Sequence, residues 1–138
     1  MKNLSTEEIK EKFENFLFNI DNYLESIIDK ANSQGYVFDY SLNSLKDMES
    51  YIIDNNITAD SDDYSDLSAY LGEVLRLTHS GKWICNLDEK NNSLYYGFPV
   101  IEGHTIPDVL FSPFHIVKAF ILRKKINLFR EAIENQVN

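Results

Sequence analysis

The stretch YLGEVLRLTHSGKWICNL, Tyr70–Leu87, contains a change in hydrophobic period. Before residue 80 the apolar positions are three and four apart, the spacing of one helix face: Leu71, Val74 and Leu75. After Gly81, which allows a sharp turn, Trp83, Cys85 and Leu87 occupy every second position, the period of a strand. Ala69 and Gly72 are small residues and leave room for another element. Trp83 is predicted to anchor the sheet on the helices.

Three helices are predicted on the N-terminal side of this switch, over residues 6–32, 42–55 and 62–79. The first begins at a capping box formed by Ser5 and Glu8. Its apolar residues form one wide stripe: Ile9, Phe13, Phe16, Leu17, Ile20, Tyr23, Leu24, Ile27, Ile28 and Ala31. The other side of this helix carries mostly charged residues: Glu7, Lys10, Glu11, Glu14 and Asp21.

A small sheet and one long helix are predicted on the C-terminal side. Strands over 83–87, 94–100 and 104–110 are joined by short turns, which favours a three-stranded antiparallel meander. Ser112-Pro113 then begins a helix over 113–135. The predicted fold class is therefore α+β, with three N-terminal helices, a three-stranded meander and a long C-terminal helix in a single domain, residues 1–138.

Composition and charge exclude several classes of function. The 138 residues include 22 acidic and 13 basic side chains, which gives a formal net charge of −9. That charge disfavours nucleic acids and anionic membranes as partners, because both are bound through Lys and Arg. Cys85 has no second cysteine to pair with, and the N-terminus carries no apolar signal segment. A cytoplasmic location is expected.

The residues that carry most enzyme chemistry lack the required spacing. Cys85 and the three histidines, His79, His104 and His115, do not form the short-spaced pairs of a zinc site. The glycines are isolated, so no phosphate-binding loop is predicted. We therefore expect no catalytic, cofactor-binding or metal-binding residues and a non-enzymatic protein. The alternative is a small hydrolase or ligand-binding protein with a pocket between the sheet and the C-terminal helix, lined by Tyr95, Tyr96, His104 and His115.

Acidic residues gather at the start of the third predicted helix. They are Asp60, Asp62, Asp63, Asp66 and Glu73. Three of them share one helix face and indicate either a solvent face or a docking surface for a basic protein partner. The second reading predicts a protein-binding module of the immunity or regulatory type. Arg123-Lys124-Lys125 can pair with this acidic face or form a separate contact. The apolar face of residues 114–129 is wide enough that a homo-oligomer is a further alternative.

Three segments also resemble a known group of sequences. They are FDYSLNSLKDMESYI (Phe38–Ile52), YLGEVLRLTHSGKW (Tyr70–Trp83) and FPVIEG…PDVLFSPFHIVKAF (Phe98–Phe120). Their order resembles that of a family of small uncharacterised bacterial proteins, in which a helix ending in LGEV leads to GKW on a strand. The resemblance implies no reaction and no site residues. Small acidic bacterial proteins of this appearance are similar to immunity proteins that neutralise a toxin.

Overall fold

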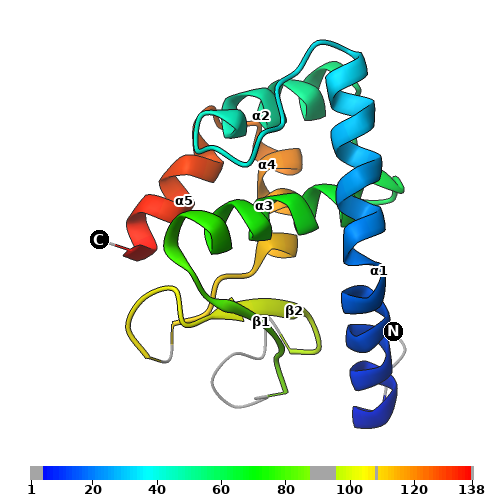
Figure 1. The fold of residues 1–138 in the computed structure, drawn as a ribbon, viewed down its shortest axis with the longest axis vertical. Coiled ribbons are helices and arrows are strands. Elements are labelled where there is room, and N and C mark those ends of the chain that lie inside the picture. Colours follow the sequence, from blue (N-terminus) through cyan, green and yellow to red (C-terminus); the bar gives the residue numbers. More distant parts are fainter. Residues whose placement is uncertain (1–4, 88–95, 108, 138) are drawn as a thin grey trace.

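The computed structural model describes residues 5–87, 96–107 and 109–137, and within these it contains five helices and a two-stranded sheet (Figure 1). The order is α1 (Thr6–Ser33), α2 (Ser44–Asp54), α3 (Asp63–His79), β1 (Lys82–Cys85), β2 (Pro99–Glu102), α4 (Pro113–Arg123) and α5 (Leu128–Val137). Helix α3 crosses the middle of the molecule, with α1 on one side and α5 on the other (Figure 1). The two strands lie toward the N-terminal end of α1, whereas α2 lies toward its C-terminal end.

The three N-terminal helices confirm the predicted elements to within two residues. The Ser5 hydroxyl accepts from the Glu8 amide at 3.1 Å, and the Glu8 carboxylate accepts from the Ser5 amide at 2.9 Å. These two bonds satisfy amides that a helix start otherwise leaves unpaired. At the other end of α1, Gly35 adopts a φ of 93° and turns the chain away from the helix.

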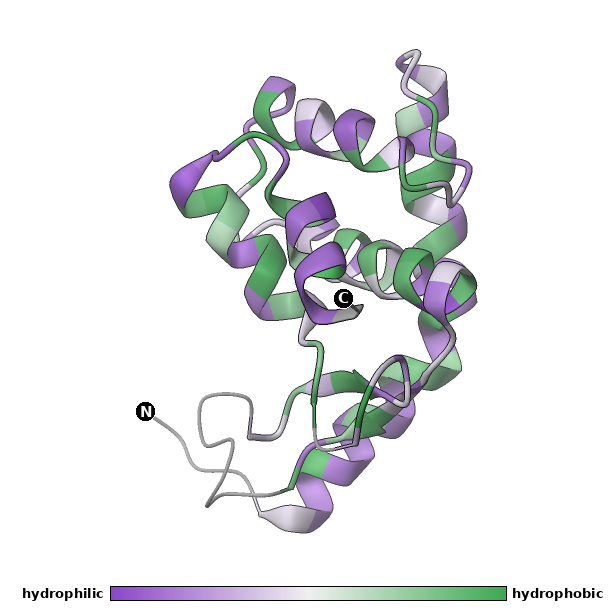
Figure 2. Cartoon of the chain, turned by 90° about the vertical axis from the view of Figure 1, so that its left-hand side faces the viewer, coloured by the Kyte–Doolittle hydropathy of each residue, from purple (hydrophilic) through white to green (hydrophobic). Residues whose placement is uncertain are grey.

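The core forms where α3 packs against α1 and α4. Leu67, Leu71 and Leu75 of α3 are fully buried. The Tyr64 hydroxyl donates to the Phe114 carbonyl at 2.6 Å, which ties α3 to the start of α4. Along the helices hydrophobic and hydrophilic segments alternate, as expected when one side of each helix faces the core (Figure 2).

The predicted α+β class with a three-stranded meander is wrong, because the described part of the chain is mostly helical and its sheet has two strands. β1 pairs antiparallel with β2, and Trp83 lies opposite Ile101. The second strand begins at Pro99, later than predicted, and residues 94 and 95 lie outside the described residues. In place of a third strand, the segment after Gly103 keeps a single bridge, between Ile101 and Phe111. Pro107 lacks the amide that a ladder requires, so the alternation does not give a strand over the described residues 104–107 and 109–110.

The predicted helix over 113–135 is also wrong, because it is two helices. α4 ends at Arg123, and Lys124 adopts a left-handed conformation with φ 52° and ψ 37°. Asn127 also has a positive φ, 72°. The buried carboxylate of Glu49, on α2, accepts from the Asn127 amide at 2.9 Å and from the Phe129 amide at 3.2 Å. A side chain distant in sequence therefore caps a new helix start.

Candidate interaction surface

The acidic residues predicted for partner binding do not form a common exposed surface. At the start of α3, the Asp63 carboxylate accepts from Lys30 Nζ and from the Tyr51 hydroxyl, both at 2.8 Å. Asp66 is 7% exposed, and its burial raises the pKa of its carboxyl to about 6. These two carboxylates tie α3 to α1 and α2.

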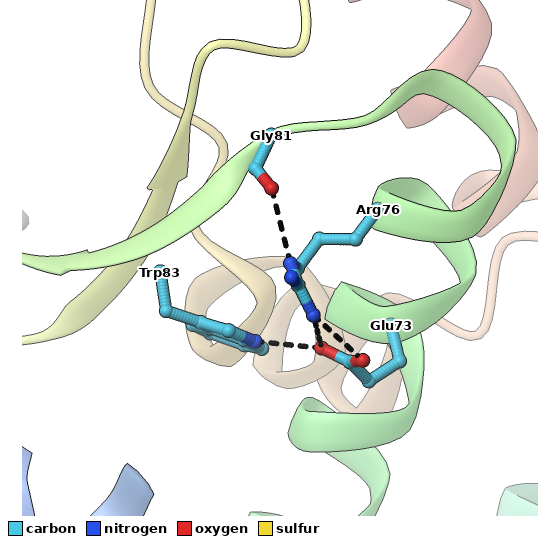
Figure 3. A network of polar contacts seen from close by, with 4 residues as sticks. All are labelled: Glu73, Arg76, Gly81 and Trp83. Atoms are coloured by element: carbon cyan, nitrogen blue, oxygen red, sulfur yellow. Dashed lines mark hydrogen bonds and ion pairs between the residues drawn. The ribbon is translucent and has the colours of Figure 1, made fainter.

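Glu73 belongs to a network that joins α3 to β1 (Figure 3). Its carboxylate accepts two bonds from Arg76 Nη1, at 2.8 and 2.9 Å, and one from Trp83 Nε1 at 2.8 Å. Arg76 Nε in turn donates to the Gly81 carbonyl at 3.1 Å. The indole lies against Gly72, which confirms that Gly72 allows a close approach and that Trp83 anchors the sheet. The network holds the turn between helix and strand.

Asp60 and Asp62 remain exposed from the predicted set. Asp62 is the N-cap residue of α3, and its side chain makes no capping hydrogen bond. Its charge lies near Lys30, whose pKa is raised by Asp63, Asp66 and Asp62. Asp62 therefore lies near the C-terminal part of α1.

A different helix presents the exposed acidic surface. Phe18 of α1 is 85% exposed, the largest exposed fraction among the large apolar side chains that the structure describes. The carboxylates three, four, seven and eleven positions away share its side of the helix and are exposed: Glu7, Glu11, Glu14, Asp21 and Glu25. We call these five carboxylates and Phe18 the Phe18 face.

The sequence contains a signal for this face, although the periodicity of the apolar residues does not reveal it. Phe18 is the one large apolar residue between 6 and 32 that does not fit the apolar stripe. Exposed aromatic side chains often dominate protein interfaces, because they bury a large area at a small cost in side-chain entropy. A lone aromatic surrounded by carboxylates therefore has the composition of a binding surface for a basic partner.

The residues of the alternative pocket are engaged in packing. His104 is buried, and its Nε2 is 2.6 Å from Gln136 Oε1 on α5, while its Nδ1 has no hydrogen-bond partner among the described residues. His115 Nδ1 is 2.7 Å from the Ser112 hydroxyl, and its ring meets Phe98 edge to face. Tyr96 is half-buried, and Tyr95 lies outside the described residues. His104 thus bonds to α5, whereas His115 bonds to the residue that precedes its own helix, α4.

The remaining candidates for chemistry show no activated group. Burial raises the pKa of the Cys85 thiol, which disfavours the reactive thiolate. His79 lies at the end of α3, with its Nδ1 2.8 Å from the Thr78 hydroxyl. Over residues 5–87, 96–107 and 109–137, no three His, Cys, Asp or Glu side chains form a group that could hold a metal ion.

Comparisons with known proteins add no relative. No family model, no curated protein and no solved structure matches the chain. The resemblance to small bacterial proteins therefore stays a prediction. Within the described part, none of the helices combines the length and the apolar character that crossing a bilayer requires.

Proposed function

We propose that the protein is a non-enzymatic binding module that engages a basic protein partner through the Phe18 face. The observation that carries this proposal is Phe18 itself, an aromatic side chain 85% exposed between helical turns of carboxylates. Binding is favoured when a partner covers the exposed ring, because apolar surface is removed from water, and the surrounding charges orient the approaching partner.

Asp63, Asp66 and Glu73 of α3 make contacts within the fold, which favours α1 over α3 as the binding surface. Each of these three carboxylates already accepts hydrogen bonds or lies buried within the fold. A partner that competed for them would have to open the contacts of α3 with α1 and β1. The carboxylates of the Phe18 face are exposed and can meet a partner without unfolding.

An inhibitory role of the immunity or regulatory type suits such a surface. A net charge of −9 attracts a basic partner over several nanometres at low salt and speeds the encounter. The buried aromatic side chain adds affinity, and added affinity in an interface appears mostly as slower dissociation. The same acidic charge keeps nucleic acid away from the surface.

A photo-crosslinking experiment in the producing cells tests the proposal. Phe18 is replaced by p-benzoylphenylalanine, and a matched variant carries the same group at Leu77, which is 65% exposed on α3. We expect a discrete covalent adduct from position 18 and none from position 77. Identical adducts from both positions, or no adduct from position 18, would contradict the proposal.

Charge-reversal variants separate the role of the carboxylates from general charge effects. Glu14→Lys with Asp21→Lys is expected to abolish the adduct at position 18. Glu102→Lys with Glu131→Lys changes the net charge by the same amount at exposed sites outside the Phe18 face. This control is expected to keep the adduct. Equal loss in both pairs would show that net charge, and not this face, controls binding.

A further inference from the structure

His104 is the buried anchor of the loop that follows β2. Among residues 103–107, all of which the structure describes, His104 alone is buried, with 7% of its surface exposed, whereas Ile106 is 68% exposed. The imidazole lies against the ring of Phe111, with the ring centroids 6.1 Å apart, and a Cβ at Gly81 would lie 3.4 Å from His104 Cβ. We call residues 103–107 the His104 loop. The position of this loop on the fold therefore depends on what holds one imidazole.

A single glutamine ties this imidazole to the last turn of α5. His104 Nε2 lies 2.6 Å from Gln136 Oε1, and Gln136 Nε2 donates to the Leu110 carbonyl at 3.1 Å. The second bond fixes the orientation of the glutamine amide, because a carbonyl can only accept and the NH2 group is the donor of the amide. The amide oxygen therefore faces the imidazole, and it too can only accept. The neutral ring must consequently carry its proton on Nε2.

The other ring nitrogen of His104 has no partner. Nδ1 is buried and makes no hydrogen bond within the described part of the chain. In the neutral ring it carries a lone pair, so the missing donor costs one hydrogen bond. Protonation would place an N–H group and a positive charge at the same buried atom with no acceptor, and burying an unpaired charge costs far more. The closed loop therefore favours the neutral ring.

No carboxylate among the described residues is placed to balance a charge on this ring. Gln136, Phe111 and Gly81 contact His104 from three segments, and all three are uncharged. The charged and titratable groups of the flanking segments have other partners: Lys82 with Glu102, Lys125 with Glu131, Arg130 with Glu134, and His79 with the Thr78 hydroxyl. The imidazole consequently has no counter-ion to keep it in place once it is charged.

We infer that His104 is an acid-sensitive latch that holds the His104 loop to the end of α5. When the ring takes up a proton, the loop leaves its site and the charged imidazole reaches water. The contact with Gln136 breaks in this movement, so the last turn of α5 loses its tie to the loop. The bridge between Ile101 and Phe111 closes the loop at its base, where the Phe111 amide donates to the Ile101 carbonyl at 2.9 Å, and it opens with the loop.

The direction of the pH dependence follows from the number of protons bound. A histidine exposed to water takes up a proton below about pH 6.5, whereas the latched ring is neutral. The open form therefore binds one more proton than the closed form, and a fall in pH through this value favours opening. From pH 7.5 to pH 5.5 the open fraction should rise about 10-fold. Above this range the latch is closed.

Amide hydrogen exchange of the full chain, expressed as protection factors, tests the latch. Protection at Phe111 and Gln136 should fall about 10-fold from pH 7.5 to pH 5.5. The amide of Leu71, buried in the middle of α3, reports global unfolding and should stay more protected than Phe111 at both values. In His104→Gln the side-chain amide can replace Nε2 as a donor but does not titrate, so protection at Phe111 should no longer depend on pH. His79→Gln is the matched control and should behave like the wild type.

Nitrogen NMR of the imidazole gives a measurement that needs no variant. A neutral ring with the proton on Nε2, a neutral ring with the proton on Nδ1 and a charged ring differ in their 15N chemical shifts. We expect the Nε2–H form for His104 at pH 7.5. Circular dichroism checks that His104→Gln is folded, and if it is not, the ring spectrum and the exchange of the wild type still decide.

Four results would overturn the inference: a proton on Nδ1 at pH 7.5, constant protection at Phe111 between the two pH values, equal protection of Phe111 and Leu71 at pH 5.5, or the same fall in a folded His104→Gln variant. None of them bears on the crosslinking from position 18. The latch and the proposed function can therefore fail independently.

Discussion

At the scale of single residues, the absent side chain of Gly72 determines how closely the sheet approaches α3. A Cβ at this position would lie 2.2 Å from Trp83 Cζ2, well inside contact distance. Gly72→Ala is therefore expected to destabilise the protein by about 1–3 kcal/mol, although alanine is the better helix former by about 1 kcal/mol. Urea unfolding of the variant and the wild type measures the difference.

The clash gives this prediction an internal control. In a Trp83→Leu background the ring is gone, so Gly72→Ala should cost little or become stabilising. A double-mutant cycle over these two positions reports the coupling directly. Equal costs of Gly72→Ala in both backgrounds would show that the indole does not set the constraint.

Asp66 gives the fold a dependence on pH with a defined sign. Burial raises the pKa of this carboxyl from 3.8 to about 6, so between these values the folded chain keeps a proton that the unfolded chain has lost. The free energy of unfolding contributed by this group therefore falls as the pH rises from about 4 to about 6. Asn at this position does not titrate. The stability of Asp66→Asn relative to the wild type should increase by about 1–2 kcal/mol from pH 4 to pH 7.

Urea unfolding of both proteins at several pH values checks this expectation. The comparison between the two isolates Asp66, because carboxylates with lowered pKa values, such as Asp39, contribute the opposite slope to both. A constant difference between the two proteins across this range would show that Asp66 does not carry the effect.

At the scale of elements, α5 depends on a cap supplied by α2. Glu49 accepts from two amides at the start of α5 and is buried. Glu49→Ala leaves these donors without an acceptor, so we expect a loss of about 1–3 kcal/mol in the free energy of unfolding. Hydrogen exchange at Asn127 and Phe129 should accelerate. Glu131→Gln, at an exposed ion pair on α5, is the control and should change stability by less than about 1 kcal/mol. Slower exchange at both amides would contradict the role of the cap.

This cap explains why the break between α4 and α5 was not predictable from the local pattern. The apolar spacing runs from Ile116 through Phe129 to Ile133 without interruption, which is typical of one helix. The break depends on a carboxylate 78 residues away from Asn127. Helix α1, in contrast, contains its own stripe and capping box, so its bounds follow from local sequence. The missing third strand is intermediate between these two cases. Pro107 is a local signal against a strand, whereas the alternation of residues 104–110 predicts one.

At the scale of the whole molecule, the positions of charged side chains were harder to predict from the sequence than those of apolar side chains. The period of α3 puts Asp62, Asp66 and Glu73 on one face, and the sequence alone cannot say which elements cover that face. In the fold, Lys30 and Tyr51 donate to the neighbouring Asp63, Trp83 donates to Glu73, Asp66 is buried, and Asp62 stays exposed. Carboxylates that could have been a surface therefore became internal ties. The sequence shows that Phe18 lies outside the apolar stripe of α1. Whether another helix covers its side chain can be seen only in the assembled fold.

A surface kept acidic for a partner should cost the free protein stability, and this expectation concerns the molecule as a whole. Within the Phe18 face, Glu11 with Glu14 and Asp21 with Glu25 place like charges one helical turn apart, and the net charge of −9 adds to the repulsion. Glu14→Gln with Glu25→Gln removes one member of each pair at nearly unchanged helix propensity. The double variant should gain about 0.5–1 kcal/mol in the free energy of unfolding at low salt.

Salt dependence distinguishes this repulsion from other effects of the two substitutions. The gain should shrink as NaCl rises toward 1 M, where screening reaches about 3 Å. Glu7→Gln is the matched control: Glu7 also lies one turn from Glu11, but it is in the first turn of α1, where the helix dipole favours an anion and offsets that repulsion. It should give no gain at any salt concentration. A gain for the double variant that persists undiminished at high salt would mean that charge on the Phe18 face does not oppose folding, and that the face carries no electrostatic cost that a basic partner could relieve.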